Sequence, residues 1–312
     1  MLITNQEDSP TKMSSIINYT SCPICNSEDF HQSLSAKDYT VSDEIFDVMH
    51  CNNCDNRFTQ NIATETEIGK YYQSENYISH SDTKKDFISK IYHSVRNITL
   101  VSKRKLIEKN VKQQKGKLLD IGAGTGAFAN AMTQAGWTVT ALEPDEQAIK
   151  KAQENYQIQL QPTAELFNFP SRQFDAITMW HVMEHVHNIH GYLEQFKKII
   201  KPSGKIFIAV PNYTSFDSSY YQQYWAGYDV PRHLYHFSPH GMKRLAQQHG
   251  FFVSKTKPMW FDSVYVSMLS EKYKNGQSNF IKALFIGLLS NIQAVFYKEK
   301  CSSVIYILEK HA

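Results

Sequence analysis

The sequence places three glycines directly after a short apolar segment, in the stretch DIGAGTG at residues 120–126. The mostly apolar residues from Leu118 to Ile121 indicate a buried strand, and the closely spaced glycines indicate a tight turn that opens a helix. A strand, a glycine turn and a helix in this order are typical of the ligand-binding corner of a doubly wound α/β fold. This pattern constrains the fold more than any other feature of the chain.

The rest of the chain after Lys117 alternates between apolar segments and segments of helical periodicity. Seven strands are expected, at residues 117–121, 138–142, 158–160, 174–179, 205–210, 251–257 and 303–308. Helices are expected up to residue 135 and over residues 145–155, 192–200 and 239–250. This alternation predicts a doubly wound, Rossmann-like and mostly parallel sheet of seven strands. Its ligand site is expected at the carboxyl ends of the strands.

Two classes of ligand fit the glycine turn, a nicotinamide dinucleotide and S-adenosylmethionine (SAM). In both cases an acid that ends the second strand holds the adenosine ribose, and Glu143, 23 residues after Asp120, has this place. A dinucleotide needs the helix N-terminus free for its pyrophosphate, whereas SAM has no phosphate and carries an ammonium group. Because Asp120 attracts an ammonium group and repels a pyrophosphate, the sequence favours SAM.

Four segments of the chain resemble, in the correct order, the motifs of class I SAM-dependent methyltransferases. They are LLDIGAGTGAFA, ALEPD, FDAITMWHVMEHV and FKKIIKPSGKIFIAVPN, and the likeness covers roughly residues 70–260. The chain is most similar to a bacterial group related to quinone, sugar and natural-product methyltransferases, some of which carry an N-terminal zinc-binding segment. The resemblance implies methyl transfer from SAM to an O, C or N atom of a small-molecule acceptor.

The resemblance also implies which residues bind the cofactor. The glycines of the turn let the backbone approach the methionine portion, and the acid before them balances its ammonium group. The acid that ends the second strand holds the ribose, residues after the third strand contact adenine, and two residues that end the fourth strand line the pocket. In chain order these residues are Asp120, Gly122, Gly124, Gly126, Glu143, Ala164, Glu165, Trp180 and His181.

Two histidine-rich stretches, residues 180–190 and 228–237, lie where strands are expected to end. Methyl transfer mainly requires the acceptor, the methyl group and the sulfur to be aligned, and a base is needed only where the acceptor loses a proton. Histidine suits that role near neutral pH. His185, His233 and His236 are the candidate bases. His181 and His185 also resemble half a metal site with Glu184 between them, but the sequence shows no third ligand.

The connection over residues 211–237 is 27 residues long and rich in aromatic side chains. A connection of this length is usually functional or disordered, and its aromatic content argues against disorder. It is therefore expected to cover the acceptor, with Arg232, Tyr228 and Tyr235 as substrate-binding candidates. In the resembling group a Pro-Arg-His-Leu-x-His-Phe segment recurs here, which favours His233 and His236 as bases. Packing roles for these residues are the alternative.

Four of the five cysteines form two Cys-x-x-Cys pairs, Cys22 with Cys25 and Cys51 with Cys54, separated by 25 residues. Two such pairs complete a closed shell of four sulfurs, which is typical of a structural zinc ribbon. Two disulfides, or a redox pair, are the alternatives. Cys301 stands alone and is expected to be a small buried hydrophobe.

The expected organisation of the chain begins with a flexible N-terminus at residues 1–18 and a zinc-ribbon-like segment at 19–62. A helical cap or linker follows at 63–115, with an amphipathic helix over residues 84–110. The methyltransferase domain occupies 116–312 and has insertions at 211–237 and 259–301. A helix in the second insertion aligns apolar residues over 280–296, which we expect to pack on the sheet; a dimer contact or a membrane surface is the alternative.

The distribution of charged residues along the chain indicates which classes of partner it can bind. The chain has 33 basic and 30 acidic residues, but residues 84–117 hold 11 Lys and Arg against 2 acids. We interpret these basic residues as a solvated helix face. Electrostatic steering of an anionic substrate is the alternative. Acids outnumber basic residues over 22–60, so a nucleic-acid partner is disfavoured. A cytoplasmic monomer or homodimer, without a transmembrane segment and with peripheral membrane contact left open, is expected.

Two rivals to a small-molecule methyltransferase remain open at this point. The first is an RNA methyltransferase that uses the zinc ribbon and the basic helix to hold its substrate. The second is a non-catalytic SAM-binding module. A nicotinamide dehydrogenase ranks behind both, because it depends on the glycines alone.

Overall fold

The computed structural model describes residues 15–73, 87–111 and 115–311. Its centre is a six-stranded sheet whose first four strands along the chain are mutually parallel where they pair, while the last two run antiparallel to their neighbours. This confirms the expected Rossmann-like α/β class. In spatial order the strands are β11 (Phe251–Pro258), β12 (Ser303–Lys310), β9 (Ile200–Pro211), β8 (Phe174–Trp180), β6 (Lys117–Ile121) and β7 (Thr138–Leu142).

The seventh strand, expected at residues 158–160, is not formed within the described part of the chain. This stretch contributes an isolated bridge between Leu142 and Gln161. Leu160 is buried there, but its neighbours Gln159 and Gln161 are exposed, and Pro162 has no N–H to continue a ladder. A single buried side chain next to a proline is too little to extend the sheet by a full strand.

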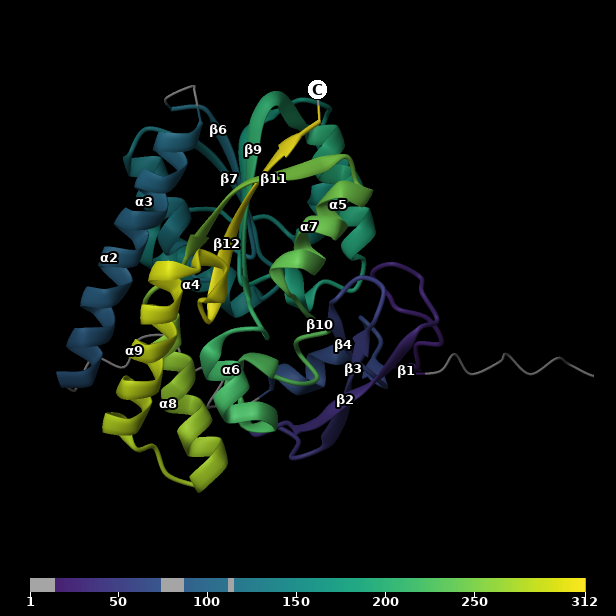
Figure 1. Cartoon of the computed structure of the whole chain (residues 1–312). Coiled ribbons are helices and arrows are strands. Elements are labelled where there is room, and N and C mark those ends of the chain that lie inside the picture. Colours follow the sequence, from purple (N-terminus) through teal and green to yellow (C-terminus); the bar gives the residue numbers. More distant parts are fainter. Residues whose placement is uncertain (1–14, 74–86, 112–114, 312) are drawn as a thin grey trace, which may run out of the picture.

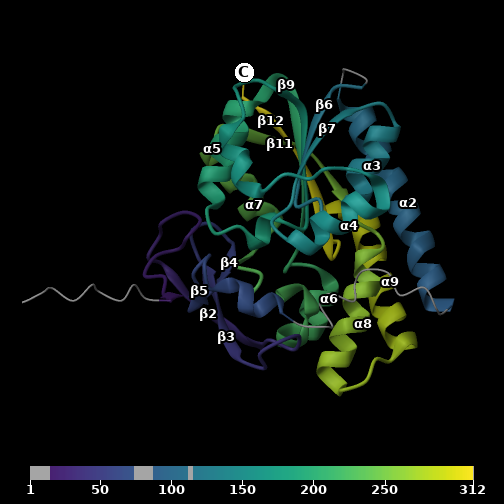
Figure 2. The same cartoon turned by 180° about the vertical axis from the view of Figure 1, so that it is seen from behind.

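Helices cover both faces of the sheet (Figures 1 and 2). On one face lie α2 (Phe87–Asn110) and α3 (Ala127–Gln134), and on the other lie α5 (Ile189–Ile199) and α7 (Pro239–Gln248). The strands alternate accordingly, since Leu118 packs with the first pair of helices and Leu119 with the second. A further helix, α4 (Glu146–Tyr156), packs its buried Ala152 beside the edge strand β7.

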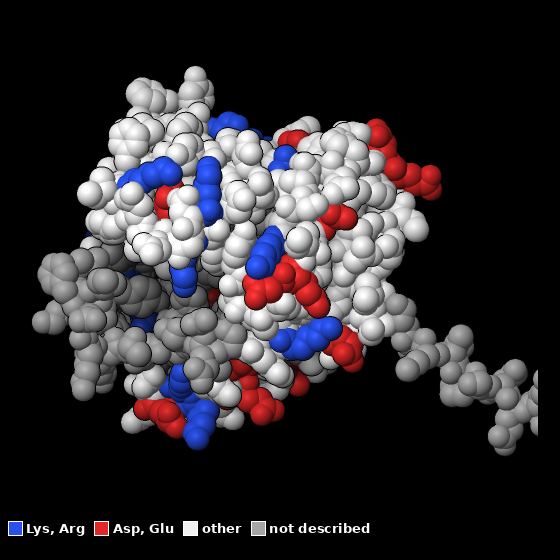
Figure 3. All heavy atoms as spheres, turned by 90° about the horizontal axis from the view of Figure 1, so that it is seen from below, with Lys and Arg blue, Asp and Glu red and all other residues white. Residues whose placement is uncertain are grey.

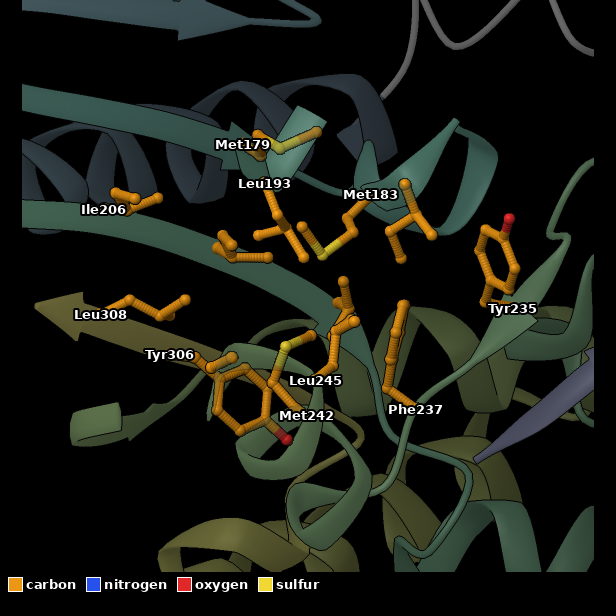
Figure 4. Packing of buried hydrophobic residues seen from close by; sticks show 14 of the residues in the cluster. Met179, Met183, Leu193, Ile206, Tyr235, Phe237, Met242, Leu245, Tyr306 and Leu308 are labelled. Carbon is orange, nitrogen blue, oxygen red and sulfur yellow. The ribbon is translucent and has the colours of Figure 1, made fainter. Parts of the chain in front are cut away.

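The larger core lies on the side of α5 and α7 and is shown in Figure 4. Strand residues of β8, β9 and β12 meet helix residues there, and the same cluster continues into the segment around residue 235. The labelled members are Met179, Met183, Leu193, Ile206, Tyr235, Phe237, Met242, Leu245, Tyr306 and Leu308. The core is therefore continuous from the central sheet to the connection that follows β9.

Helix boundaries follow the expected signals closely. Ser238 caps α7 by accepting from the N–H of Gly241 at 2.9 Å, and Asp145 caps α4 by accepting from the N–H of Ala148 at 2.7 Å. The amphipathic helix expected over 84–110 is described from Phe87 onward, and residues 84–86 lie outside the described part of the chain. The helix expected from residue 192 begins earlier, at Ile189, because Asn188 supplies its cap.

The N-terminal segment forms a second, antiparallel sheet from β2 (Phe30–Lys37), β3 (Ile45–Cys51) and β4 (Arg57–Thr59). Its fourth strand is β10 (Tyr235–His236), which comes from the 211–237 connection and pairs with β4. The short strands β1 (Ile16–Ile17) and β5 (Ile62–Ala63) pair beside it. Residues 16 and 17 are thus held in a strand pair, which corrects the expected flexibility of that part of residues 1–18; residues 1–14 are outside the described part.

The two insertions lie at the carboxyl ends of the parallel strands (Figures 1 and 2). The first holds α6 (Phe216–Tyr221) and the short 3₁₀ turns η4 (Gln222–Tyr224) and η5 (Ala226–Tyr228). The second holds an antiparallel pair of helices, α8 (Asp262–Asn275) and α9 (Phe280–Phe296), followed by η6 (Lys298–Lys300). Together with the N-terminal sheet and its 3₁₀ helix η1 (Ile68–Tyr72), they enclose this end of the molecule.

The apolar stripe of α9 does not pack as expected. Its large residues, among them Phe280, Leu288 and Phe296, are 56%, 47% and 76% exposed. Apart from Ile286, the buried face of α9 consists of small residues such as Gly287, where an added Cβ would lie 2.8 Å from the Cα of Val264 in α8. Small side chains let the two helices approach closely, which turns the bulky side chains outward. No helix in the described ranges has both the length and the apolar character to cross a bilayer.

A buried ion network joins the N-terminal sheet to the 211–237 connection. Arg232 is 1% exposed, and its guanidinium donates to Asp229 at 2.6 and 3.1 Å, to Asp38 at 2.9 Å and to the carbonyl oxygen of Tyr71 at 2.9 Å. The two carboxylates raise the pKa of Arg232 against the effect of burial. One side chain therefore links β2, η1 and the connection before β10.

Arg232→Met is expected to lower the free energy of unfolding by about 3 to 5 kcal/mol, because it leaves the buried Asp38 and the partly buried Asp229 without their cation. Urea unfolding of the full chain measures this change. Lys150→Met is the matched control, since it removes an exposed pair with Glu154 and should cost less than about 0.5 kcal/mol. Equal effects of the two substitutions would contradict the linking role of Arg232.

Candidate active site

The glycine turn lies between β6 and α3, against the ends of two neighbouring strands. The N–H of Gly122 donates to the carbonyl oxygen of Leu142 at 2.9 Å, which holds the turn beside the end of β7. Gly122, Gly124 and Gly126 have φ values of +69°, +54° and +78°, a region that favours glycine. A Cβ on Gly122 would lie 2.3 Å from Cγ2 of Val182, so the turn also touches the segment after β8.

Glu143 follows β7 directly and contacts this turn. Its Oε2 accepts a hydrogen bond from the N–H of Gly124 at 2.7 Å, and its Oε1 accepts from the N–H of Asp145 at 3.1 Å. Burial raises the pKa of the Glu143 carboxyl, and the two N–H donors act in the opposite direction. The acid predicted to hold a ribose and the predicted glycine turn are therefore neighbours.

Asp120 is 1% exposed and lies in β6 just before the turn. Thr178 donates a hydrogen bond to its Oδ1 at 2.7 Å. Burial raises the pKa of Asp120 to about 7, although Thr178 and the charge of Lys103 lower it. A nearby cation would stabilise this buried carboxyl group, because a positive charge favours its ionised form.

Lys103 belongs to this site, which sequence reasoning missed by assigning it to a solvated basic helix face. Its Nζ lies 4.4 Å from the centre of the Trp180 ring. Burial lowers the pKa of Lys103 to about 8, against the attraction of Asp262 and Asp120. The helical periodicity of residues 84–110 could have revealed this, since Lys103 stands four residues before the buried Ile107 and thus near the inward face.

The residues predicted to contact adenine lie in the 3₁₀ helix η2 (Thr163–Asn168). The main chain connects this helix to the ribose acid, because the N–H of Glu143 donates to the carbonyl oxygen of Gln161 at 3.0 Å. Ala164 is exposed, and Glu165 accepts a hydrogen bond from the side chain of Asn168 at 3.1 Å. Glu165 therefore stabilises its own helix here, and adenine contact remains a prediction for both residues.

Trp180 and His181 end β8 as predicted. The Trp180 ring packs edge-to-face on Phe128, with 5.5 Å between ring centres. His181 has a φ of +58°, and its ring nitrogens lie 2.9 Å from Asp262 and 3.3 Å from Glu184. Burial lowers the pKa of His181, but the two carboxylates outweigh it and raise the value to about 10. His181 is thus an imidazolium near neutral pH and has no lone pair with which to take up a proton.

Glu184, His185 and His233 come together beside this strand end. The first two lie in the 3₁₀ helix η3 (Met183–His185), and Oε1 of Glu184 is 4.0 Å from Nε2 of His233. The rings of His185 and His233 meet edge-to-face with 4.6 Å between their centres. Burial and the nearby His233 lower the pKa of His185 to about 4, so its imidazole is neutral at physiological pH. The structure unites two of the three predicted bases.

The remaining predicted acceptor residues are directed into the N-terminal segment instead. Each of them is buried and bonded within the protein: His236 contacts the hydroxyl of Thr59 at 3.1 Å, and Tyr235 donates to the carbonyl oxygen of His187 at 3.1 Å. Tyr228 accepts a hydrogen bond from Arg57. With Arg232 held by two carboxylates, these contacts are those of packing residues, which was the alternative interpretation of the sequence.

Tyr72 is a further residue of the site that the sequence did not single out. Its hydroxyl lies 3.0 Å from Nδ1 of His185. It comes from η1 of the N-terminal segment, at the start of a tyrosine-rich stretch whose described part ends at residue 73. The density of tyrosines before the long helix was a usable signal, but nothing in the sequence paired it with His185.

The four N-terminal cysteines converge at one point. Their sulfur atoms lie within 4.8 Å of one another, and all four cysteines are free thiols in the structure. The Sγ atoms of Cys22 and Cys54 are 3.7 Å apart, and those of Cys25 and Cys51 are 3.5 Å apart, well beyond disulfide bonding distance. Cys301 is fully buried near α8 and α9, as expected.

Comparison with curated proteins finds quinone methyltransferases among the relatives. Over 110 residues the chain is 36% identical to a ubiquinone biosynthesis O-methyltransferase of Actinobacillus pleuropneumoniae, covering 31% of this chain and 47% of the relative. Over 96 residues it is 31% identical to a demethylmenaquinone methyltransferase of Tropheryma whipplei, covering 30% and 40%. The chain thus spans less than half the length of these two relatives.

Solved structures with a similar chain path include methyltransferases. A SAM-dependent methyltransferase from Archaeoglobus fulgidus matches with a TM-score of 0.48 and 19% identity, over 72% of this chain and all of that one. A Burkholderia thailandensis 1,6-didemethyltoxoflavin-N1-methyltransferase matches with a TM-score of 0.46 and 15% identity, over 84% and 99% of the two chains.

The family model described as a methyltransferase domain matches residues 92–255, which is more than half of the 312-residue chain. The match begins within α2 and ends within β11, so it contains the glycine turn, Glu143, the end of β8 and the cluster around His233. The four motifs on which the resemblance rests lie inside it. By this match the chain belongs to the family of class I SAM-dependent methyltransferases.

Proposed function

We propose that this chain transfers a methyl group from SAM to a small-molecule acceptor. The contact between Glu143 and the N–H of Gly124 carries the proposal, because it brings the proposed ribose acid and the glycine turn together at the ends of β6 and β7. Asp120, buried and inclined to accept a cation, would balance the ammonium group of SAM. Ala164, Glu165, Trp180 and His181 would complete the cofactor site. The chain would supply no redox chemistry; SAM itself carries the reactive methyl group.

The acceptor would lie between the end of β8 and the 211–237 connection. Glu184 is fully buried there and His233 is 8% exposed, so this site suits a small molecule better than a polymer. The two curated relatives are a ubiquinone biosynthesis O-methyltransferase and a demethylmenaquinone methyltransferase, which supports an acceptor of quinone size. Sugars and other natural products are acceptors of the same size class.

His185 and His233, with Glu184, would prepare an acceptor hydroxyl or a similar group for attack. His185 is neutral and its ring is held by Tyr72 and by the carbonyl oxygen of Arg232, each at 3.0 Å. His181, charged and paired with Asp262, would position Glu184 without exchanging a proton. Arg232, Tyr228, Tyr235 and His236 would act through the packing of the connection that covers the acceptor.

A small molecule is a better-supported partner than RNA. Figure 3 views the molecule from below. The described residues of this face show Lys and Arg side chains interspersed with Asp and Glu rather than a continuous basic surface. Lys103, which an RNA-binding helix face would present to phosphates, lies over the Trp180 ring instead. A monomer or homodimer in the cytoplasm remains our expectation for the chain.

We also propose that Cys22, Cys25, Cys51 and Cys54 hold a structural zinc ion. Two left-handed residues, Asn26 and Asp55, close the two turns, and their N–H groups donate to the carbonyl oxygens of Cys22 and Cys51 at 2.8 and 3.0 Å. Four sulfurs leave no position open for a substrate, so this zinc would stabilise the fold. It would support the acceptor site indirectly, because β4 pairs with β10.

Gly122→Ala is expected to weaken binding of S-adenosylhomocysteine at least about 10-fold, since the new Cβ would collide with Val182 and shift the turn. Isothermal titration calorimetry measures the affinity. Gly69→Ala is the matched control, because no atom lies within 4 Å of its added Cβ. Binding of a nicotinamide dinucleotide by a chain that ignores S-adenosylhomocysteine would reject the proposed function.

His233→Ala is expected to slow methyl transfer by about 100-fold while the affinity for S-adenosylhomocysteine stays within about threefold. Radiolabelled SAM offered with fractionated extract of the source organism identifies the acceptor fraction for the assay. For His236→Ala we expect a loss of about 1 to 2 kcal/mol of stability without a selective loss of transfer, because its ring contacts Thr59 and packs on Tyr228 within the connection. Parallel loss of transfer and cofactor affinity in His233→Ala would indicate a structural role for His233.

Cys54→Ser is expected to abolish zinc binding at the four-cysteine site and to lower the thermal unfolding midpoint, because the metal contributes directly to folding. Zinc content by mass spectrometry and circular dichroism measure the two effects. Cys301→Ala is the control and should keep its zinc. A chain that folds with the same midpoint after complete zinc removal would contradict the structural role.

A further inference from the structure

Glu184, His185 and His233 offer three ligand atoms that lie within 4.8 Å of one another. We propose that they bind a divalent first-row transition-metal ion, distinct from the zinc at the four cysteines. Two imidazole nitrogens and one carboxylate oxygen are a ligand set that zinc and its neighbours take in proteins, and it leaves positions open for other ligands. The sequence showed His181 and His185 four residues apart with Glu184 between them; the fold adds His233 and leaves His181 outside the three.

The carboxylate of Glu184 is prepared for such an ion. The side chain is fully buried, and neither oxygen receives a hydrogen bond from any described residue. Its Oε1 lies 3.3 Å from Nδ1 of His181, but Nε2 of the same ring lies 2.9 Å from Asp262, so the two carboxylates share one imidazole. A buried carboxylate that shares its cation in this way is stabilised by a further cation.

Both imidazoles are held in the form that a metal requires. Nδ1 of His233 lies 2.9 Å from the carbonyl oxygen of Gly227, and Nδ1 of His185 lies 3.0 Å from that of Arg232. A carbonyl oxygen only accepts, so these contacts place the ring proton on Nδ1 and leave the lone pair on Nε2. Metal-binding histidines usually donate their second ring N–H to a backbone carbonyl in this way.

The distances suit a shared ion after small side-chain shifts. Two ligands about 2.1 Å from one ion lie roughly 3 to 4 Å apart, depending on the coordination geometry. Oε1 of Glu184 and Nε2 of His233 are 4.0 Å apart. Asp229 is also near, with an oxygen 3.9 Å from the same nitrogen.

The charged side chains around the cluster carry more negative than positive charge. Two cations face four carboxylates within hydrogen-bonding or ion-pair distance in this part of the structure, and Lys103 adds a third cation attracted to Asp262, so one negative charge remains in excess. The two groups are Arg232 with Asp38 and Asp229, and His181 with Asp262 and Glu184. A divalent cation would offset this excess.

A metal ion at this place would act on the acceptor, an extension that rests on the proposed function. An acceptor hydroxyl bound at an open position would have a lowered pKa and would lose its proton to solvent. Its oxygen would then attack the methyl carbon, the C–O bond would form as the C–S bond breaks, and S-adenosylhomocysteine would leave. His185 and His233 would serve as metal ligands in this scheme rather than as bases.

Metal binding is tested on the full zinc-loaded chain, without SAM or acceptor, by titration with Co²⁺ and visible absorption. With the four cysteines already filled by zinc, the wild type is expected to bind Co²⁺ with nitrogen and oxygen ligands and without a sulfur charge-transfer band. Glu184→Gln and His233→Gln should each weaken this binding at least about 10-fold. If the purified chain already holds a second zinc ion, the same two variants should lose it.

His249→Gln is the matched control, because His249 is also buried and paired with a glutamate, Glu194 at 2.7 Å, outside the cluster. Circular dichroism verifies that each variant is folded. The proposal is overturned if the zinc-loaded wild type takes up neither Co²⁺ nor a second zinc, or if the control loses as much affinity as the two ligand variants. Since no cofactor is present, this result is independent of whether the chain binds SAM.

Discussion

The buried guanidinium of Arg232 holds the acceptor end of the molecule together. It joins Asp38 of the N-terminal sheet to Asp229 of the connection after β9, and its own carbonyl oxygen fixes the ring of His185. Replacing such a cation by a neutral residue strands two charges away from water, so the arrangement tolerates little variation. The side chain thus fixes the stretch of backbone whose carbonyl oxygen holds His185, although it touches neither cofactor nor acceptor in our proposal.

The proximity of the proposed cofactor residues was predictable because they follow one another along the chain and at strand ends. Asp120, Gly122 and Glu143 belong to consecutive strands and turns, and parallel strands bring such ends to one edge. The acceptor half was not predictable in the same way. His233 and Glu184 are 49 positions apart in the sequence, and their contact depends on a connection with no regular periodicity.

Helices were predicted best where the spacing of apolar residues and a capping residue indicated the same boundary, as for α7 with Ser238. The strand predicted at 158–160 is not formed in this described stretch. The buried Leu160 gave the stretch an apolar character, but the residues around it do not form a continuous ladder of hydrogen bonds with β7. The large apolar residues of α9 were predicted to form its packed face. Gly287 and the small residues near it instead decide which face packs against α8. The inward orientation of Lys103 was missed because a count of charges does not show where each one points, although its spacing of four residues from the buried Ile107 indicated it.

The strand β10 completes the N-terminal sheet from a distant part of the chain. Thr59 and His236, which touch across this junction, are separated by 177 positions. During synthesis the ribosome therefore delivers β2, β3 and β4 long before the strand that closes their edge. Until then the edge of β4 that faces away from β3 has no native neighbour, and the small sheet depends on the pairing of β2, β3 and β4 and on the cysteine cluster. A bound metal at the cysteines would thus matter most in the nascent protein, before the catalytic half exists.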